Sequence, residues 1–158
     1  TEDVPVTVIS GIYTNVIAKD NYLYLMPQKL DNGIMKYNLK DKSQKIIHVS
    51  GKYECTTQYE CSFIVDDIIY GLPWDGNTMY MFDCRNDRIE TKEINNNFGR
   101  IYSYYFAQKI NDGSYLIISD SKKNPCLIWK KDEIKVIDIG LPDDYFIKEL
   151  LMEIEERR

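Results

Sequence analysis

Several patterns typical of membrane proteins and of common enzyme classes are missing from this 158-residue sequence. It has one histidine, His48, and no nucleophile, phosphate-loop or paired-histidine motif. No apolar run reaches the roughly 18 residues that a membrane helix needs. The net charge of −5 disfavours nucleic acid as a partner. We therefore expect no membrane span, no nucleic acid, no cofactor and no metal, and binding is favoured over catalysis.

Cysteine is present without a recognisable spacing, since Cys55, Cys61, Cys84 and Cys126 form no C-x-x-C pair. An apolar content of 44% can build a core without cross-links. Buried reduced thiols are therefore the preferred interpretation, with a disulfide or a metal site as alternatives. No signal-peptide pattern is visible, which slightly favours a soluble cytoplasmic protein. The chain begins at Thr1 rather than Met, however, so a removed signal stays open.

Tyrosine is abundant, and an internal repeat organises most of the chain. The 13 tyrosines favour β-structure, because this residue suits a pleated, half-buried surface. The segments DNYLYLMPQ, DDIIYGLPW and DGSYLIISD begin at Asp20, Asp66 and Asp112, at a spacing of 46 residues. Downstream, the runs IMKY, MYMF and CLIW each end on an aromatic residue. The upstream tyrosines that keep the same step are Tyr13, Tyr59 and Tyr105.

Each repeat is predicted to hold four short strands separated by turn residues. The three repeats cover about 10–50, 56–95 and 102–140, within a β-domain over 1–141. The predicted strands are 15–18, 22–26, 34–39 and 45–49, then 59–65, 68–72, 79–83 and 88–94, and finally 105–110, 115–118, 126–129 and 133–139.

Four strands in about 46 residues resemble the blade of a β-propeller, close to the period of WD40 and kelch repeats. The Trp-Asp dipeptide of WD40 repeats and the double glycine of kelch repeats are missing, so the similarity is closer to uncharacterised bacterial propellers. The resemblance implies an all-β fold of three propeller-type blades and no catalytic residues. Since propellers close with about four to eight blades, it also implies either a fragment of a longer chain or a homodimer with six blades.

The last segment, 142–158, changes character and predicts an amphipathic helix. Pro142 and Asp143 are typical of a helix start, and apolar residues follow at helical spacing. This helix could pack against its own blades or serve a partner or self-association.

A binding face is predicted from the propeller resemblance, where the loops after the second and fourth strands meet. An aromatic side chain beside charged and amide groups suits a glycan or an anchoring contact with a partner protein. The alternative for Trp74 is a structural wedge between blades. The predicted ligand-binding residues are Trp74, Asp75, Tyr53, Arg100, Tyr102 and Gln28.

A second hypothesis is a glycan-active propeller enzyme. A glycosidase needs two acids across the scissile bond, and Asp75, Glu54 and Glu60 are the candidate carboxylates. The sequence alone does not bring these acids to the required separation, so the non-enzymatic binding module is preferred.

Overall fold

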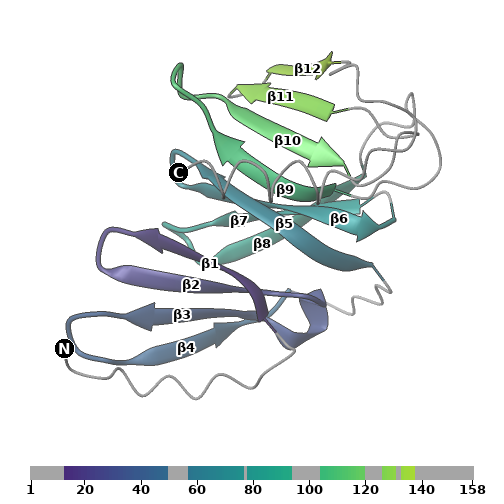
Figure 1. Cartoon of the computed structure of the whole chain (residues 1–158). Coiled ribbons are helices and arrows are strands. Elements are labelled where there is room, and N and C mark those ends of the chain that lie inside the picture. Colours follow the sequence, from purple (N-terminus) through teal and green to yellow (C-terminus); the bar gives the residue numbers. More distant parts are fainter. Residues whose placement is uncertain are drawn as a thin grey trace, which may run out of the picture.

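The computed structural model describes residues 13–49, 57–76, 78–93, 104–119, 126–130 and 133–137. This part of the chain is all-β, with three antiparallel four-stranded sheets (Figure 1). Its one helical element is a 3-10 turn, η1 (Leu30–Asn32). The amphipathic helix predicted over 142–158 lies outside the described residues.

Each sheet is built from four strands that follow one another along the sequence. Sheet 1 contains β1 (Tyr13–Lys19), β2 (Tyr22–Pro27), β3 (Ile34–Asn38) and β4 (Gln44–Ile47). Sheet 2 contains β5 (Gln58–Val65), β6 (Ile68–Asp75), β7 (Thr78–Asp83) and β8 (Arg88–Glu93). Sheet 3 contains β9 (Tyr104–Lys109), β10 (Tyr115–Ser119), β11 (Cys126–Lys130) and β12 (Glu133–Ile137).

The predicted repeat is visible in the pairing of the strands. All twelve predicted strands are present, and most differ from the prediction only by a residue or a few at their ends. At equivalent positions of the repeat, an aliphatic or aromatic residue of the second strand pairs with an aromatic residue of the third strand in every sheet. These pairs are Leu23↔Tyr37, Ile69↔Phe82 and Tyr115↔Trp129.

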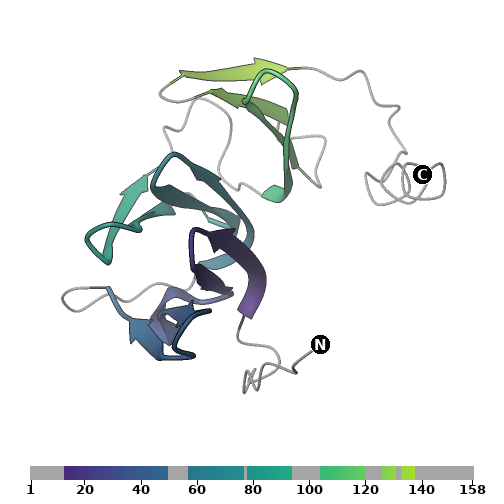
Figure 2. The ribbon, with the colours of Figure 1, turned by 90° about the vertical axis from the view of Figure 1, so that its left-hand side faces the viewer.

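The sheets pack face to face in sequence order, with sheet 2 between the other two (Figures 1 and 2). We call the face of a sheet that looks toward the next sheet its front, and the opposite face its back. One core joins the front of sheet 1 to the back of sheet 2 and includes Ile17, Tyr24, Met26, Ile34, Ile69, Tyr80 and Phe82. A second core joins the front of sheet 2 to the back of sheet 3 and includes Phe63, Leu72, Met79, Tyr115, Ile117, Leu127 and Trp129.

Sheet 2 is therefore apolar on both faces, as its near-continuous apolar strands require. Aromatic contacts dominate both cores. In the first, the rings of Tyr59 and Tyr80 meet edge to face at 4.8 Å between centroids. In the second core, the ring centroids of Phe63 and Trp129 lie 5.3 Å apart. Burial of these large side chains is the main source of contact energy between the sheets.

Candidate functional site

The first strand of every sheet carries a β-bulge at the same position. Thr14, Glu60 and Tyr105 are the extra residues, each lying between two residues whose partners are adjacent on the second strand. Pro27 and Pro73 stand opposite the bulges of β1 and β5. Proline has no backbone N–H, so a regular ladder cannot continue there. Bulges bend a strand and redirect its side chains, and they are common beside functional sites.

The repeated tyrosine of sheet 3 is Tyr104, so the prediction of Tyr105 from the 46-residue spacing was wrong by one residue. Tyr104 precedes the bulge of β9 as Tyr59 precedes that of β5, and both side chains are 0% exposed. The shift has its origin in the following turn. Segment 110–114 is one residue longer than the equivalent segment 65–68 of sheet 2.

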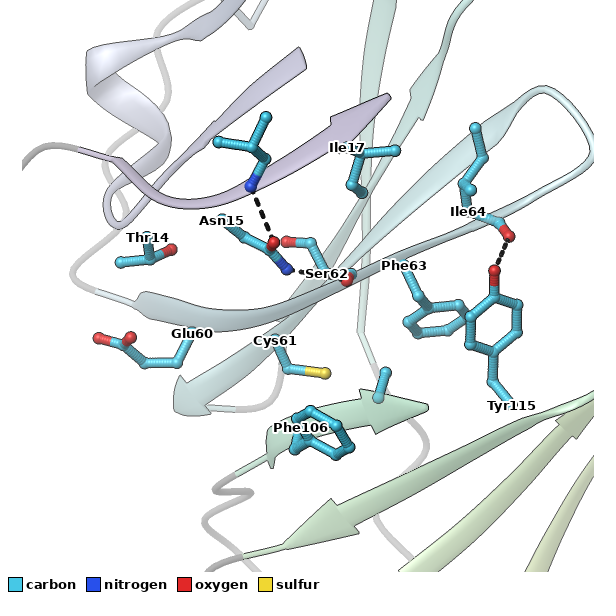
Figure 3. Close-up of a pocket in the computed structure, with 12 residues that line it drawn as sticks. Thr14, Asn15, Ile17, Glu60, Cys61, Ser62, Phe63, Ile64, Phe106 and Tyr115 are labelled. Carbon is cyan, nitrogen blue, oxygen red and sulfur yellow. Dashed lines mark hydrogen bonds between the residues drawn. The ribbon is translucent and has the colours of Figure 1, made fainter. Parts of the chain in front are cut away.

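The first strands of the three sheets line an open pocket of about 540 Å³ (Figure 3). Strand β1 contacts β5, and β5 contacts β9, so the three strands form one continuous wall. The volume lies in the range of about 300–1,000 Å³ that is typical of small-ligand sites. We call this cavity the first-strand pocket. Its lining consists of Thr14, Asn15, Val16, Ile17, Glu60, Cys61, Ser62, Phe63, Ile64, Phe106, Ala107 and Tyr115.

Side chains from both neighbouring sheets close the free edge of β5 along this pocket. Asn15 also occupies the edge of its own strand, because its Oδ1 accepts a hydrogen bond from the Val16 amide at 2.8 Å. An edge whose backbone groups are engaged is a poor template for another strand. The three bonds to β5 run from Thr14 Oγ1 to the Tyr59 carbonyl (3.0 Å), from Asn15 Nδ2 to the Ser62 carbonyl (3.0 Å) and from the Tyr115 hydroxyl to the Ile64 carbonyl (2.6 Å).

A carboxylate and an amide meet at the bulge end of the pocket. Gln28 Nε2 donates a hydrogen bond to Glu60 Oε1 at 2.9 Å. The main-chain carbonyl of Gln28 accepts a hydrogen bond from the Tyr59 amide at 2.8 Å, which holds Gln28 beside β5. A carboxylate offers about four acceptor positions, so Glu60 retains capacity for a ligand. Among the described residues that line the pocket, Glu60 is the charged one. Phe106, which is half-buried, contributes an aromatic ring from β9 (Figure 3).

The pocket thiol is not suited to nucleophilic chemistry. Cys61 is 1% exposed, and burial raises its pKa to about 12, so the thiol stays protonated at neutral pH. Reduced, buried thiols are confirmed for Cys61, Cys84 and Cys126, whereas Cys55 lies outside the described residues. Burial likewise raises the pKa of Cys84 to about 11. In the described part of the chain, His, Cys, Asp and Glu nowhere form a group of three that could hold a metal ion.

The residues predicted for the binding face are only partly described. Trp74 is 38% exposed and lies in β6, which continues to Asp75, so the structure extends a strand where the sequence predicted a loop after Leu72. Asp75 pairs with Gln58 on β5. Gln28 meets Glu60 at the first-strand pocket, as described above. Tyr53, Arg100 and Tyr102 lie outside the described residues.

For the enzyme hypothesis, Glu60 is placed at the pocket, whereas Glu54 and the side chain of Asp75 are not described. Thr14, Asn15 and Phe106 are pocket residues that sequence reasoning missed. A signal for the bulges was present, because the repeated prolines pair with the repeated tyrosines, Pro27 with Tyr13 and Pro73 with Tyr59. A proline at a fixed place in a paired strand indicates an interrupted ladder.

Comparisons with known proteins relate the chain to other structures by fold only. No protein-family model matches it, and no curated protein matches it. The extracellular domain of BT4673 from B. thetaiotaomicron, described as a one-component system, aligns with a TM-score of 0.58 at 12% identity over 91% of this chain. A second structure of that domain, described as a hybrid two-component system, gives 0.57 at 11% identity over 91% of this chain.

The chain spans only 19% and 18% of the lengths of those two chains. The computationally designed Ika8 protein aligns with a TM-score of 0.48 at 10% identity, over 78% of this chain and 35% of its own. Within the described residues, no helix has the length and apolar character needed to cross a membrane. The fold and the first-strand pocket, together with the likeness to the BT4673 domain in fold, are the basis for the proposal that follows.

Proposed function

We propose that the chain is a binding module made of three propeller-type blades, and that its first-strand pocket receives a glycan. The propeller arrangement is supported by the repeated front-to-back packing of four-stranded sheets whose first strands lie side by side. The likeness to the BT4673 domain covers nearly all of this chain but about a fifth of that one, which supports a place for such sheets in a larger assembly. Three blades leave the ring open, so further blades are needed for closure.

The observation that carries the proposal is the hydrogen-bonded pair of Gln28 and Glu60 in a pocket that Phe106 also lines. Neighbouring sugar hydroxyls each donate and accept hydrogen bonds, and a carboxylate next to an amide offers both functions at short range. The ring of Phe106 and the 57% exposed Val16 supply apolar surface for the C–H face of a sugar ring. The occupied edges of β1 and β5 disfavour a peptide bound as an added strand.

The test is a titration with a panel of neutral mono- and disaccharides, followed by calorimetry and by backbone NMR shifts. We expect shifts at Glu60 and Phe106, and at least tenfold weaker binding for Glu60→Ala and Phe106→Ala. Trp74→Ala is the matched control, because Trp74 is also an accessible aromatic but does not line the pocket. Binding that depends on Trp74 instead would return the site to the predicted loop face. A panel with no binder would favour a partner protein.

A further inference from the structure

At the bulge end of the first-strand pocket, three hydrogen-bond donors are already used within the protein. The Thr14 hydroxyl donates to the Tyr59 carbonyl at 3.0 Å, and the Tyr59 amide donates to the Gln28 carbonyl at 2.8 Å. One N–H of the Gln28 side chain donates to Glu60 Oε1 at 2.9 Å. Gln28 keeps a second N–H, whereas the side chains of Glu60 and Thr14 have only oxygen lone pairs left for a ligand.

The charge at this end of the pocket is negative. Glu60 supplies a carboxylate, and neither Lys nor Arg is among the described residues that line the pocket. Two lysines of sheet 1 are paired elsewhere, Lys19 with Asp67 and Lys36 with Asp87, each at 2.6 Å. The net charge of −5 acts in the same direction. A cationic group of a ligand is therefore attracted to Glu60, and an anionic group is repelled.

Among the polar groups that sugars carry, a protonated amine matches both observations. An ammonium group has three donors and no acceptor, so it suits a site that is left with acceptors. Its hydrogen bond to a carboxylate is roughly twice as strong as one between neutral groups. A sugar hydroxyl brings a single donor and no charge. A sugar carboxylate brings acceptors only, and its charge has the same sign as that of Glu60.

We propose that the first-strand pocket prefers basic amino sugars, with the ammonium group on the carboxylate of Glu60, and discriminates against acidic sugars. The inference rests on the proposed function, because it names the class of glycan for the same pocket. Figure 3 shows Glu60 and Thr14 at the end of the pocket that is remote from Tyr115, and Phe106 between these ends. The amine thus lies at the bulge end, and the sugar ring extends along the first strands toward Phe106.

The test compares glucosamine, glucose and glucuronate, which are close in size and differ in charge. Calorimetry is carried out in one mildly acidic buffer, in which the amine of glucosamine is protonated. We expect the wild type to bind glucosamine about fivefold more tightly than glucose, as one partly exposed ion pair provides. Glucuronate should bind most weakly. Glu60→Gln keeps the shape of the side chain and removes its charge, so it should abolish the preference for glucosamine over glucose.

Two control variants separate the pocket from the overall charge of the protein. Glu93→Gln makes the same change in net charge at an exposed residue of β8 that does not line the pocket. It should keep the preference for glucosamine. Phe106→Ala should weaken the binding of glucosamine and glucose alike, and leave the ratio of their affinities unchanged.

Equal binding of glucosamine and glucose by the wild type, or a preference that survives Glu60→Gln, would overturn the inference. If glucose binding is then still weakened by Phe106→Ala, the proposed function stands without the preference for amines. A wild type that binds none of the three sugars would overturn both.

Discussion

At the scale of single residues, the fit of Tyr80 depends on the absence of a side chain at Gly71. Gly71 pairs with Tyr80 across β6 and β7, and a Cβ atom on Gly71 would lie 2.0 Å from the tyrosine ring. The tyrosine is fully buried, and its hydroxyl lies 3.1 Å from Ser62 Oγ behind the pocket wall. The missing side chain at Gly71 thus leaves room for the Tyr80 ring, which packs in the core between sheets 1 and 2 and reaches the pocket residue Ser62 with its hydroxyl.

Gly71→Ala is expected to lower the free energy of unfolding by about 1–3 kcal/mol, because the added methyl overpacks a dense core. Urea unfolding followed by circular dichroism measures the change. In Gly71→Ala combined with Tyr80→Leu, the alanine should cost less than it does alone, since the ring it strikes is gone. Fully additive effects of the two substitutions would contradict the steric account.

Asp112 is expected to make stability depend on acid pH. Hydrogen bonds from Ser114, and then the interaction with Lys130, lower its pKa from 3.8 to about 2. A carboxyl whose folded pKa is depressed stabilises the fold above its unfolded pKa and loses that effect as the pH falls through the folded value. Asp112→Asn should therefore lower Tm at pH 7, and the difference from wild type should shrink between about pH 4 and pH 2.

Thermal unfolding of both proteins across that pH window provides the measurement. Lys130→Gln is the companion variant. It should cause a smaller loss at pH 7, since the hydrogen bonds from Ser114 contribute more to the shift than Lys130 does. A Tm difference for Asp112→Asn that stays constant from pH 7 to pH 2 would disprove the role of the charge.

At the scale of elements, each first strand contains a β-bulge that interrupts its hydrogen-bond ladder. Side chains also bond the backbone groups along the free edges of β1 and β5. Asn15 serves two strands at once, donating to the Ser62 carbonyl of β5 and accepting from the Val16 amide of β1. Tyr115 closes the other end of β5 from sheet 3. The pocket wall is thus a set of strand edges that are satisfied within the molecule and present side chains to a ligand.

Asn15→Ala is expected to destabilise the fold by about 1 kcal/mol, because it removes two hydrogen bonds at a partly solvated edge. Hydrogen exchange of the Val16 amide should accelerate at the same time. Thr14→Ser is the control, since it keeps a hydroxyl for the Tyr59 carbonyl and leaves the Val16 amide bonded. An unchanged exchange rate at Val16 would mean that Asn15 does not protect this edge.

The sequence predicted elements well where the physical signal was local. Apolar runs between turn residues located all twelve strands, and the recurrence of Asp20 and Asp66 marked two hairpin turns, at which both residues have positive φ. The error at Tyr105 arose because one added turn residue shifts a strand register without disturbing the apolar pattern. Spacing alone does not reveal such an insertion.

The pocket was harder to predict than the strands, because it depends on contacts between sheets. Glu60 and Gln28 are 32 residues apart in sequence and meet only when sheets 1 and 2 pack. The sequence predicts Gln28 as a ligand-binding residue of the loop face and Glu60 as a candidate carboxylate, without indicating that the two side chains meet. The sequence predicts a loop at Trp74, because an aromatic residue beside a proline is typical of a loop. In the structure, β6 continues through Trp74 to Asp75.

At the scale of the whole molecule, the account depends on one contact repeated between successive sheets. The ion pair between Lys36 and Asp87, at 2.6 Å, marks that contact between sheets 1 and 2. Between sheets 2 and 3, the Tyr115 hydroxyl donates a hydrogen bond to the Ile64 carbonyl at 2.6 Å. Packing of the sheets brings the three first strands together at the first-strand pocket.

The most direct test of the account is the sugar titration of the wild type and of the variants Glu60→Ala, Phe106→Ala and Trp74→Ala. The account predicts at least tenfold weaker binding for the first two, because both residues line the first-strand pocket, and unchanged binding for Trp74→Ala, because Trp74 does not line it. Binding that is lost in Trp74→Ala and kept in the other two variants would contradict a site at this pocket.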